Sequence, residues 1–484
     1  MIDISKSINN PMTLIDNREN SESNKLIETI INYLFWCMLI LFTNPGGIVE
    51  SLNIYYITTK ININDLLFVL LTLCHFIIPK EKTIFDIDYI RTKKLLLIFL
   101  TYYLIVFITI VPIVNGNLNY SLPEALIKSR YTVYALLISI YTYEFFKRRW
   151  DIFLNVFLFS SVVVLILFIA TVVTKLHILQ IGLVNRGFVN INRNLMQSQG
   201  IMPLLIPLGV VVIVFNLRIK YRNLILIGFT LMSIAYILEL WRRNIIALFV
   251  FFILAIAANA LINRRYTLLL GNTVKIILLI ASLTFIAYLI FPRYINAAAV
   301  GIKESFSVLE TERDISGRKD LRMTLDRPFI NEKFYQHPFF GTGFDNRWRT
   351  TGGDNQGYEA ADYPFLAALA MFGIIGLLVF LPIYFVIVKV LKLDFEFLRA
   401  NNNKNIKSVL FLFVITFMIY FVFDLVQYFN YFQAVSNSDF YYNWYIFLSL
   451  YLAARSRLYA SELDVNKVES NEFQQYTKTF LSSN

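Results

Sequence analysis

Five arginines lie in short polar segments between long apolar stretches, and they are the residues best suited to binding chemistry. They are Arg186, Arg193, Arg242, Arg243 and Arg318. A guanidinium group can form two parallel hydrogen bonds with one phosphate, whereas a lysine ammonium acts as a point charge. Few lysines accompany the arginines in these segments. The pattern therefore indicates recognition of phosphate through forked hydrogen bonds.

Three further residues are candidates for substrate contact or proton transfer. Asp362 and Asp424 lie near the ends of apolar stretches, and His337 precedes a segment rich in glycine and phenylalanine. Gly341 and Gly343 in that segment indicate a sharp turn whose backbone N–H groups face an anion. Each side chain also has an alternative role. Asp362 could cap a helix or pair with an arginine, Asp424 could pair with an arginine, and His337 could lie at the surface or in packing.

The sequence contains no recognisable metal or cofactor site. None of its three histidines is spaced with another histidine or cysteine as zinc ligands are. Cys37 and Cys74 lie inside apolar runs and imply no disulfide framework. We therefore expect neither metal nor cofactor, so that positive charge at the site must come from the arginines.

The elements that position these residues must be membrane helices. Of the 484 residues, 57% are hydrophobic and only 16% are charged, whereas soluble domains contain about 25% charged residues. The apolar residues come in blocks, and one membrane span needs about 20 of them. This composition excludes a soluble enzyme, a disordered protein and a nucleic-acid-binding domain. We predict an all-α polytopic integral membrane protein.

Twelve apolar stretches are predicted to span the membrane. They are residues 27–43, 65–79, 95–114, 125–146, 152–173, 200–217, 223–240, 244–262, 275–292, 363–388, 408–426 and 441–455. Spans one to nine thus occupy residues 27–291 and spans ten to twelve occupy residues 362–455, with tails at 1–26 and 456–484. The first tail lacks the basic segment and apolar core of a cleavable signal peptide. Residues 292–361 form one long polar loop.

The basic residues predict the orientation of the spans. Alternate connecting loops are rich in lysine and arginine, as at residues 80–94, 147–149 and 389–407, and by the positive-inside rule these loops are cytoplasmic. Both termini then lie in the cytoplasm, and the 292–361 loop lies outside. The alternation holds along the whole chain without a re-entrant segment.

The five arginines fall on the outer side, where the same rule disfavours them. The alternatives to a binding role are that Arg242 or Arg243 pairs with Glu239, or that the arginines reach lipid headgroup phosphates. Arg130, near the outer end of span four, is a further candidate, and reaching outward to the headgroups is its alternative too.

Three segments resemble motifs of the O-antigen polymerase and ligase superfamily of polytopic glycosyltransferases. Residues 187–192, Gly-Phe-Val-Asn-Ile-Asn, are similar to the family's Gly-x-Phe-x-x-Pro-Asn stretch but lack its proline. Residues 242–247, Arg-Arg-Asn-Ile-Ile-Ala, are similar to its Ser-Arg-Gly-Ala tip, with Arg243 in the arginine position. Residues 316–318 and 337–344 resemble its Ser-Gly-Arg and Pro-Leu-x-Gly-x-Gly-Phe pair. The likeness covers about residues 180–390.

The resemblance implies a metal-independent glycosyltransferase of GT-C-like architecture in the bacterial inner membrane. Such an enzyme joins undecaprenyl-diphosphate-linked oligosaccharide repeat units of O-antigen or capsular polysaccharide at the outer face of that membrane. Arg243 would be catalytic, and the residues expected to bind substrate are Arg186, Arg193, Arg242, Arg318, His337 and Asp424. A chain-length regulator and a flippase are the protein partners expected for a polymerase.

One departure from the family favours a polymerase over a ligase. The ligase branch carries a histidine before a Gly-x-x-Gly motif, and counting back from Gly373 and Gly376 places that histidine at position 362. This sequence has Asp362 there, which we expect to act as the catalytic base. The alternatives are a ligase that transfers glycan to lipid A-core, and a transporter of lipid-linked sugars. The single long outer loop argues against a transporter, because transporters usually have matching halves.

Overall fold

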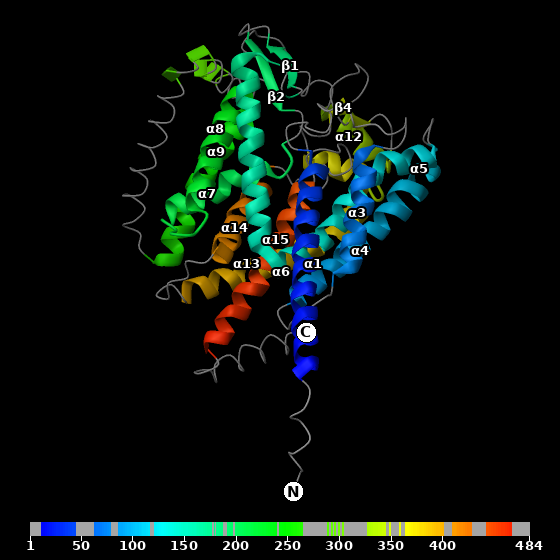
Figure 1. The fold of residues 1–484 in the computed structure, drawn as a ribbon. Coiled ribbons are helices and arrows are strands. Elements are labelled where there is room, and N and C mark those ends of the chain that lie inside the picture. Colours follow the sequence, from blue (N-terminus) through cyan, green and yellow to red (C-terminus); the bar gives the residue numbers. More distant parts are fainter. Residues whose placement is uncertain are drawn as a thin grey trace.

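Long apolar stretches of this sequence form helices, because a helix satisfies its own backbone hydrogen bonds where water is absent. The computed structural model describes residues 11–44, 62–78, 86–116, 121–176, 181–186, 191–196, 199–239, 242–264, 327–344, 348–349, 358–359, 364–400, 409–427 and 442–466, with a few single residues elsewhere. The helices stand side by side as a bundle, and the short strands and α12 lie at one end of it (Figure 1).

The helices follow the predicted spans closely. They are α1 (Pro11–Phe42), α3 (Ile63–Ile77), α4 (Ile87–Tyr102) continued by the π-helix η4 (Tyr103–Ile110) and by α5 (Val111–Val114), α6 (Leu122–Thr174), η5 (Met202–Leu204) with α7 (Leu205–Val214), α8 (Arg222–Glu239), α9 (Arg242–Asn263), α12 (Arg327–Gln336), α13 (Pro364–Ala400), α14 (Val409–Gln427) and α15 (Tyr442–Asn466). A helix covers every predicted span except the ninth, residues 275–292, which lies largely outside the described residues.

The length and composition of the helices support the membrane character of the chain. Within the described ranges, six helices are long and apolar enough to cross a bilayer, and three shorter apolar helices accompany them. The helix α15 belongs to neither group, although it coincides with the predicted last span. A count of twelve crossings therefore stays a prediction.

The 53-residue helix α6 is kinked between the two stretches that the sequence predicts as separate spans. Its backbone leaves helical geometry at Arg149. On either side of this kink, Phe145 stacks on Phe35 of α1 and Phe153 packs against Trp36, the next residue of α1. In a continuous helix, positions 145 and 153 would lie about 12 Å apart along the axis. Adjacent residues of α1 can contact both only if the chain reverses at the kink.

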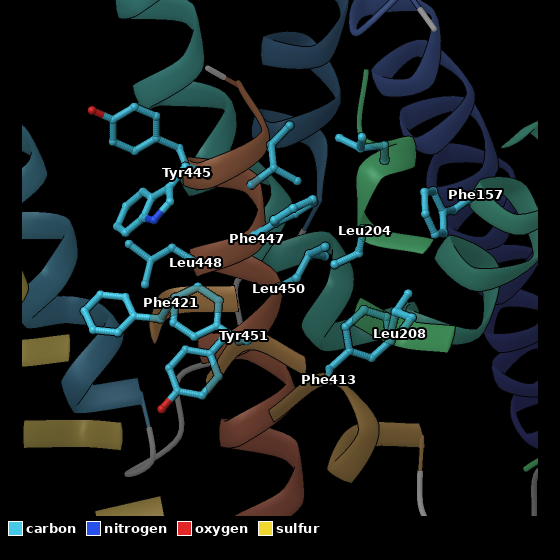
Figure 2. Packing of buried hydrophobic residues seen from close by; sticks show 14 of the residues in the cluster. Phe157, Leu204, Leu208, Phe413, Phe421, Tyr445, Phe447, Leu448, Leu450 and Tyr451 are labelled. Atoms are coloured by element: carbon cyan, nitrogen blue, oxygen red, sulfur yellow. The ribbon is translucent and has the colours of Figure 1, made fainter. Parts of the chain in front are cut away.

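The helix α15 forms the centre of the bundle. Every residue from Trp444 to Ser456 is buried. Figure 2 shows its side chains, among them Phe447 and Leu450, packed against residues of α14, of η5 and α7, and of the second half of α6. A helix that is buried on all sides needs partners for its polar groups.

Those polar groups meet at the end of the bundle where α1 begins and α15 ends (Figure 1). Arg455 of α15 donates from Nη1 to Asp88 at the start of α4 and from Nε to Asp394 of α13, both at 2.7 Å. Asp394 also accepts hydrogen bonds from Tyr451 and Tyr459. Both carboxylates and the guanidinium are buried. We call Asp88, Asp394 and Arg455 the inner triad.

A second buried ion pair lies beside the inner triad. Lys147, at the end of the first half of α6, donates to Asp86 at 2.6 Å, and Ser456 donates to the same carboxylate at 3.0 Å. Tyr143 donates to it as well. Lys147 was predicted to lie in a cytoplasmic loop, and its basic neighbours Arg148 and Arg149 follow it directly. The two ion pairs tie α4, α6, α13 and α15 together at the end predicted to be cytoplasmic.

Candidate functional site

The segment with Arg186 and Arg193 folds as a β-hairpin, which is a departure from the all-α prediction. Strand β1 (Ile181–Arg186) pairs antiparallel with β2 (Ile191–Met196), and Arg186 stands opposite Ile191 while Val184 stands opposite Arg193. Six-residue polar segments are too short to span a membrane, and pairing satisfies their backbone groups instead.

The hairpin register brings the two arginine positions together. Positions opposite each other in a ladder share a face of the ribbon, and so do positions two residues apart. Arg186 and Arg193 are therefore diagonal neighbours on one face, with backbones about 7–8 Å apart. The register therefore places backbone positions 186 and 193 close together on the hairpin.

The buried carboxylate of Glu239 connects this hairpin to the end of α8, just before the segment that carries Arg242 and Arg243. Glu239, the last residue of α8, is 1% exposed. Its Oε1 accepts the backbone N–H of Met196 at 3.0 Å, and its Oε2 accepts Gln199 Nε2 at 2.7 Å. The helix α9 begins three residues later, at Arg242. The end of β2 is therefore bonded to the last residue of α8, three positions before the start of α9.

The C-terminal part of α14 packs against α9. Phe423 of α14 lies 4.4 Å from Phe251 of α9 between ring centroids. Asp424 follows Phe423 directly, and Phe251 lies about two helical turns after Arg243. The structure thus places the backbone positions of Asp424 and Arg243 on neighbouring helices at the same end of the bundle.

The remaining predictions for this site can be located only in part. Arg318 and Asp362 lie outside the described residues. For Arg186, Arg193, Arg242, Arg243 and Asp424 the backbone is described and the side chain is not. The alternative pairing of Glu239 with Arg242 or Arg243 involves these side chains, so it also stays a prediction.

His337 belongs to a different part of the same end of the bundle. It follows α12, and its backbone N–H donates to Lys333 and Phe334, closing that helix. Partial burial, and then the positive charge of Lys333, hold the pKa of His337 below its ordinary value. The imidazole is therefore neutral at pH 7, which suits a proton acceptor better than a cationic phosphate ligand.

The predicted anion-binding turn at Gly341 and Gly343 is wrong. We call residues 338–344 the glycine turn. The backbone N–H groups of Gly341, Thr342 and Gly343 donate to the carbonyl oxygens of His337, Ala370 and Met371. All three donors are thus used within the protein, and none is left to bind an anion.

The glycine turn instead supplies hydrogen-bond acceptors at a break in α13. Gly373 adopts φ 66° and ψ −177° in the middle of this helix, which interrupts its hydrogen bonds. The N–H groups of Ile374 and Ile375, just after the break, donate to Pro338 and Phe339 of the turn, both at 2.9 Å. A broken helix in a membrane is tolerated where other protein groups satisfy its backbone.

Close contact between two backbones explains both glycines. A Cβ atom at Gly341 would lie 2.2 Å from the carbonyl oxygen of Met371, and one at Gly373 would lie 2.2 Å from that of Phe339. In the sequence, Gly373 and Gly376 form the ligase-like Gly-x-x-Gly motif and were expected to permit close helix packing. Gly376 packs against Tyr102, whose hydroxyl would lie 2.9 Å from a Cβ there.

Gly373→Ala is expected to destabilise the protein strongly. The backbone conformation alone carries about 1–3 kcal/mol for a residue with a side chain, and the collision with Phe339 adds to it. Gly116→Ala is the matched control, because Gly116 also has a positive φ but nothing lies within 4 Å of its Cβ position. Unfolding of both variants in detergent measures the difference. Equal loss of stability in the two would contradict the role assigned to the contact.

Asn115 holds the glycine turn in place and Tyr102 binds the backbone at the break of α13, and neither was among the candidate residues. Asn115, just after α5, donates from Nδ2 to the carbonyl oxygens of Gly341 and Thr342 at 3.1 and 3.3 Å. Tyr102 donates to the carbonyl of Phe372 at 3.2 Å. No local signal marks these residues, because their partners lie more than 200 positions further along the chain.

Arg130 has a structural partner. Its Nε lies 3.2 Å from Asp65 Oδ1, and Tyr134 donates to the same oxygen. Asp65 also caps the start of α3 together with Asn62. Arg130 is thus held in an ion pair. This role differs from both roles suggested by the sequence, which were substrate binding and contact with lipid headgroups.

Comparison with known proteins gives no family assignment. No protein-family model, no curated protein and no solved structure matches this chain. In the part of the chain that the structure describes, no three His, Cys, Asp or Glu side chains gather as a metal site would require. A function must therefore be argued from the residues and their arrangement.

Proposed function

We propose that this chain is a metal-independent glycosyltransferase that joins undecaprenyl-diphosphate-linked oligosaccharide repeat units into an O-antigen or capsular polysaccharide. The reaction would take place at the outer face of the bacterial inner membrane, with both termini of a twelve-span, GT-C-like chain in the cytoplasm. A flippase would deliver the substrate, and a chain-length regulator would be a further partner. The observation that carries the proposal is the junction at Glu239, which brings two arginine-bearing segments to one end of a membrane bundle.

The proposed chemistry has two requirements. A hydroxyl of one lipid-linked repeat unit attacks the anomeric carbon of the growing glycan, the bond from that carbon to the lipid diphosphate breaks, and a glycosidic bond forms. The leaving diphosphate gains negative charge, which Arg186, Arg243 and Arg318 would stabilise by charge-assisted hydrogen bonds. The proton of the attacking hydroxyl would pass to Asp362.

The other proposed residues surround this centre. Arg193 shares a face of the hairpin with Arg186, and Arg242 directly precedes Arg243. We assign both to the diphosphate. Asp424, on the helix beside α9, would accept hydrogen bonds from sugar hydroxyls. His337 lies after α12 with a neutral imidazole and would contact the glycan near the long loop.

The decisive experiment combines gene deletion with purified protein. Deletion should leave a surface polysaccharide with a single repeat unit and no ladder on a gel, and the purified protein should restore polymer from lipid-linked repeat units in detergent. Long chains stranded on the carrier lipid would instead indicate a ligase. Lipid-linked units retained in the inner leaflet would indicate a transporter. Either result would overturn the polymerase.

Glu239→Gln is expected to weaken substrate binding. The glutamine amide would direct an N–H group at one of the two donors that Glu239 now accepts. A buried donor left unpaired costs about 1–3 kcal/mol, so the hairpin should loosen and kcat/KM should fall about tenfold, mainly through KM. Glu332→Gln on α12, an exposed position, is the matched control. A purely structural Glu239 would reduce the amount of folded enzyme and leave its KM unchanged.

Asp362→Asn is expected to lower kcat about 10²-fold or more, because asparagine keeps the shape of the side chain and cannot accept the proton. Folding should be unaffected, since asparagine also caps helices well. Asp362→His should recover part of the lost activity if the site accepts the histidine of the ligase branch. Full activity of Asp362→Asn would remove this residue from the mechanism and leave His337 and Asp424 as the candidates for the base.

A further inference from the structure

The glycine turn carries two large aromatic side chains that the protein does not cover. Phe339 is 64% exposed and Phe340 is 49% exposed. The backbone beside them is held in place by hydrogen bonds to α13, to η4 and to Asn115, and Thr342 is only 2% exposed. The turn is therefore a fixed structure with a phenylalanine edge facing away from the bundle.

The depth of the turn can be measured along α13. The break at Gly373 lies 16 residues before Lys389, the first charged residue that follows it in this helix. At 1.5 Å per residue this distance is about 24 Å. The hydrocarbon core of a bilayer is about 30 Å thick. With Lys389 at the inner boundary, Gly373 and the turn bonded to it lie within the hydrocarbon, below the outer headgroups.

A second helix gives the same depth independently. The backbone N–H of Phe344, at the end of the turn, donates to the carbonyl oxygen of Phe107 in η4 at 3.1 Å. Phe107 lies 13 residues after Lys94, the last of the basic residues near the start of α4. This distance is at most about 20 Å, again less than the hydrocarbon thickness. Along the same span Asn115, which donates to Gly341 and Thr342, lies 21 residues after Lys94, or at most about 32 Å. The two spans together therefore place the turn between the outer half of the hydrocarbon and its outer boundary.

The surroundings of the turn at this depth are apolar and exposed. Ile374 and Leu378 of α13 are 40% and 58% exposed, and Ile113 and Val114 of α5 are 61% and 76% exposed. Asn115, the residue after α5, binds the turn directly. The exposed phenylalanines therefore continue the surface that these two spans present to lipid.

We infer that the glycine turn is a re-entrant segment of the long outer loop, and that Phe339 and Phe340 contact the acyl chains of the outer leaflet. This revises the predicted topology, in which the whole 292–361 loop stands outside the membrane. The inference rests on helix geometry and holds whether or not the proposed enzyme activity is correct.

Spin labelling of the full chain in phosphatidylcholine vesicles tests this inference. Cys37 and Cys74 are first replaced by alanine, and a nitroxide is then attached to a cysteine at position 340 through Phe340→Cys. Collision rates with oxygen, which partitions into hydrocarbon, and with a water-soluble nickel chelate report the depth. Ile253→Cys, on an exposed face of α9, serves as the lipid reference, and Glu332→Cys serves as the water reference.

The ratio of oxygen to nickel collisions at position 340 should match that at position 253 and exceed that at position 332 several-fold. A ratio like that of position 332 would overturn the inference, because the phenylalanines would then face water. Low access of both reagents would overturn it too, since protein would cover the site. Spin–spin broadening that disappears on dilution with unlabelled chain would then identify a second copy as the cover. Phe339→Cys repeats the test if Phe340→Cys does not fold.

Discussion

Arg455→Ala is expected to be the most destabilising single substitution considered for this protein. The guanidinium of Arg455 is buried and donates to Asp88 and Asp394, whose carboxylates are buried as well. Alanine would leave two buried carboxylates without their cation, and only the hydroxyls of Tyr451 and Tyr459 would still donate to Asp394. Removal of one partner from a buried ion pair typically costs about 3–5 kcal/mol. Reversible unfolding in mixed micelles should show a loss in this range or a failure to fold.

Two comparison variants separate the buried charge from other effects. Arg149→Ala makes the same chemical change at an ion pair with Asp151 that is about a third exposed, and it should cost about 1 kcal/mol or less. Arg455→Met combined with Asp88→Asn and Asp394→Asn removes every charge of the inner triad and should recover much of the lost stability. Failure of the triple variant to exceed Arg455→Ala in stability would show that packing, rather than unpaired charge, causes the loss.

The membrane helices could be predicted from sequence because their signal is local. About 20 apolar residues in succession specify a span without reference to the rest of the chain. The reversal inside α6 follows in the same way, since Lys147, Arg148 and Arg149 interrupt its apolar run and are disfavoured in hydrocarbon. Each predicted span that the structure describes therefore contains a helix, although α1, α13 and α15 extend into regions predicted as tails or loops.

Contacts between distant segments could not be predicted. Asp88 and Arg455 are separated by 367 positions, and nothing in either segment marks the other as its partner. The glycine turn shows the same limit at shorter range. Two glycines correctly indicated a tight turn, but the partners of their N–H groups are carbonyls of Ala370 and Met371, which are free only because α13 breaks. The local motif therefore predicted the shape of the turn correctly. It predicted an anion as the partner of the N–H groups, whereas their partners are carbonyl oxygens of the protein.

The candidate site was predicted only in part, because its residues carry a local signal and the contacts between its segments do not. The arginines were found because charge is conspicuous on the outer side of a membrane protein. The bonding of the hairpin to α8 through Glu239 was not predicted, since Glu239 was considered only as a partner for Arg242 or Arg243. The bonds from Met196 and Gln199 to this carboxylate show that it joins the hairpin to α8. This junction motivates the strongest functional prediction.

Arg243→Ala is expected to lower the rate of polymerisation about 10²–10³-fold, because one charge-stabilising donor commonly contributes about 2.7–4 kcal/mol to catalysis. Arg243→Lys should also lose much of the activity, since lysine keeps the charge but cannot form a forked pair of hydrogen bonds with the diphosphate. Both variants should fold and reach the membrane normally. The measurement is the initial rate of polymer formation from purified lipid-linked repeat units.

A matched control lies at the other end of the same helix. Arg264 follows α9 at the end predicted to be cytoplasmic and its side chain is exposed, so Arg264→Lys should leave the rate unchanged. Arg186→Ala and Arg318→Ala extend the test to the other two members of the proposed clamp. If these two variants and Arg243→Ala all polymerise at the rate of the unaltered enzyme, the arginines do not bind the leaving diphosphate. A loss confined to Arg243→Ala would instead assign the leaving group to the α8–α9 tip alone, because the hairpin and the long loop would then contribute no charge to the transition state.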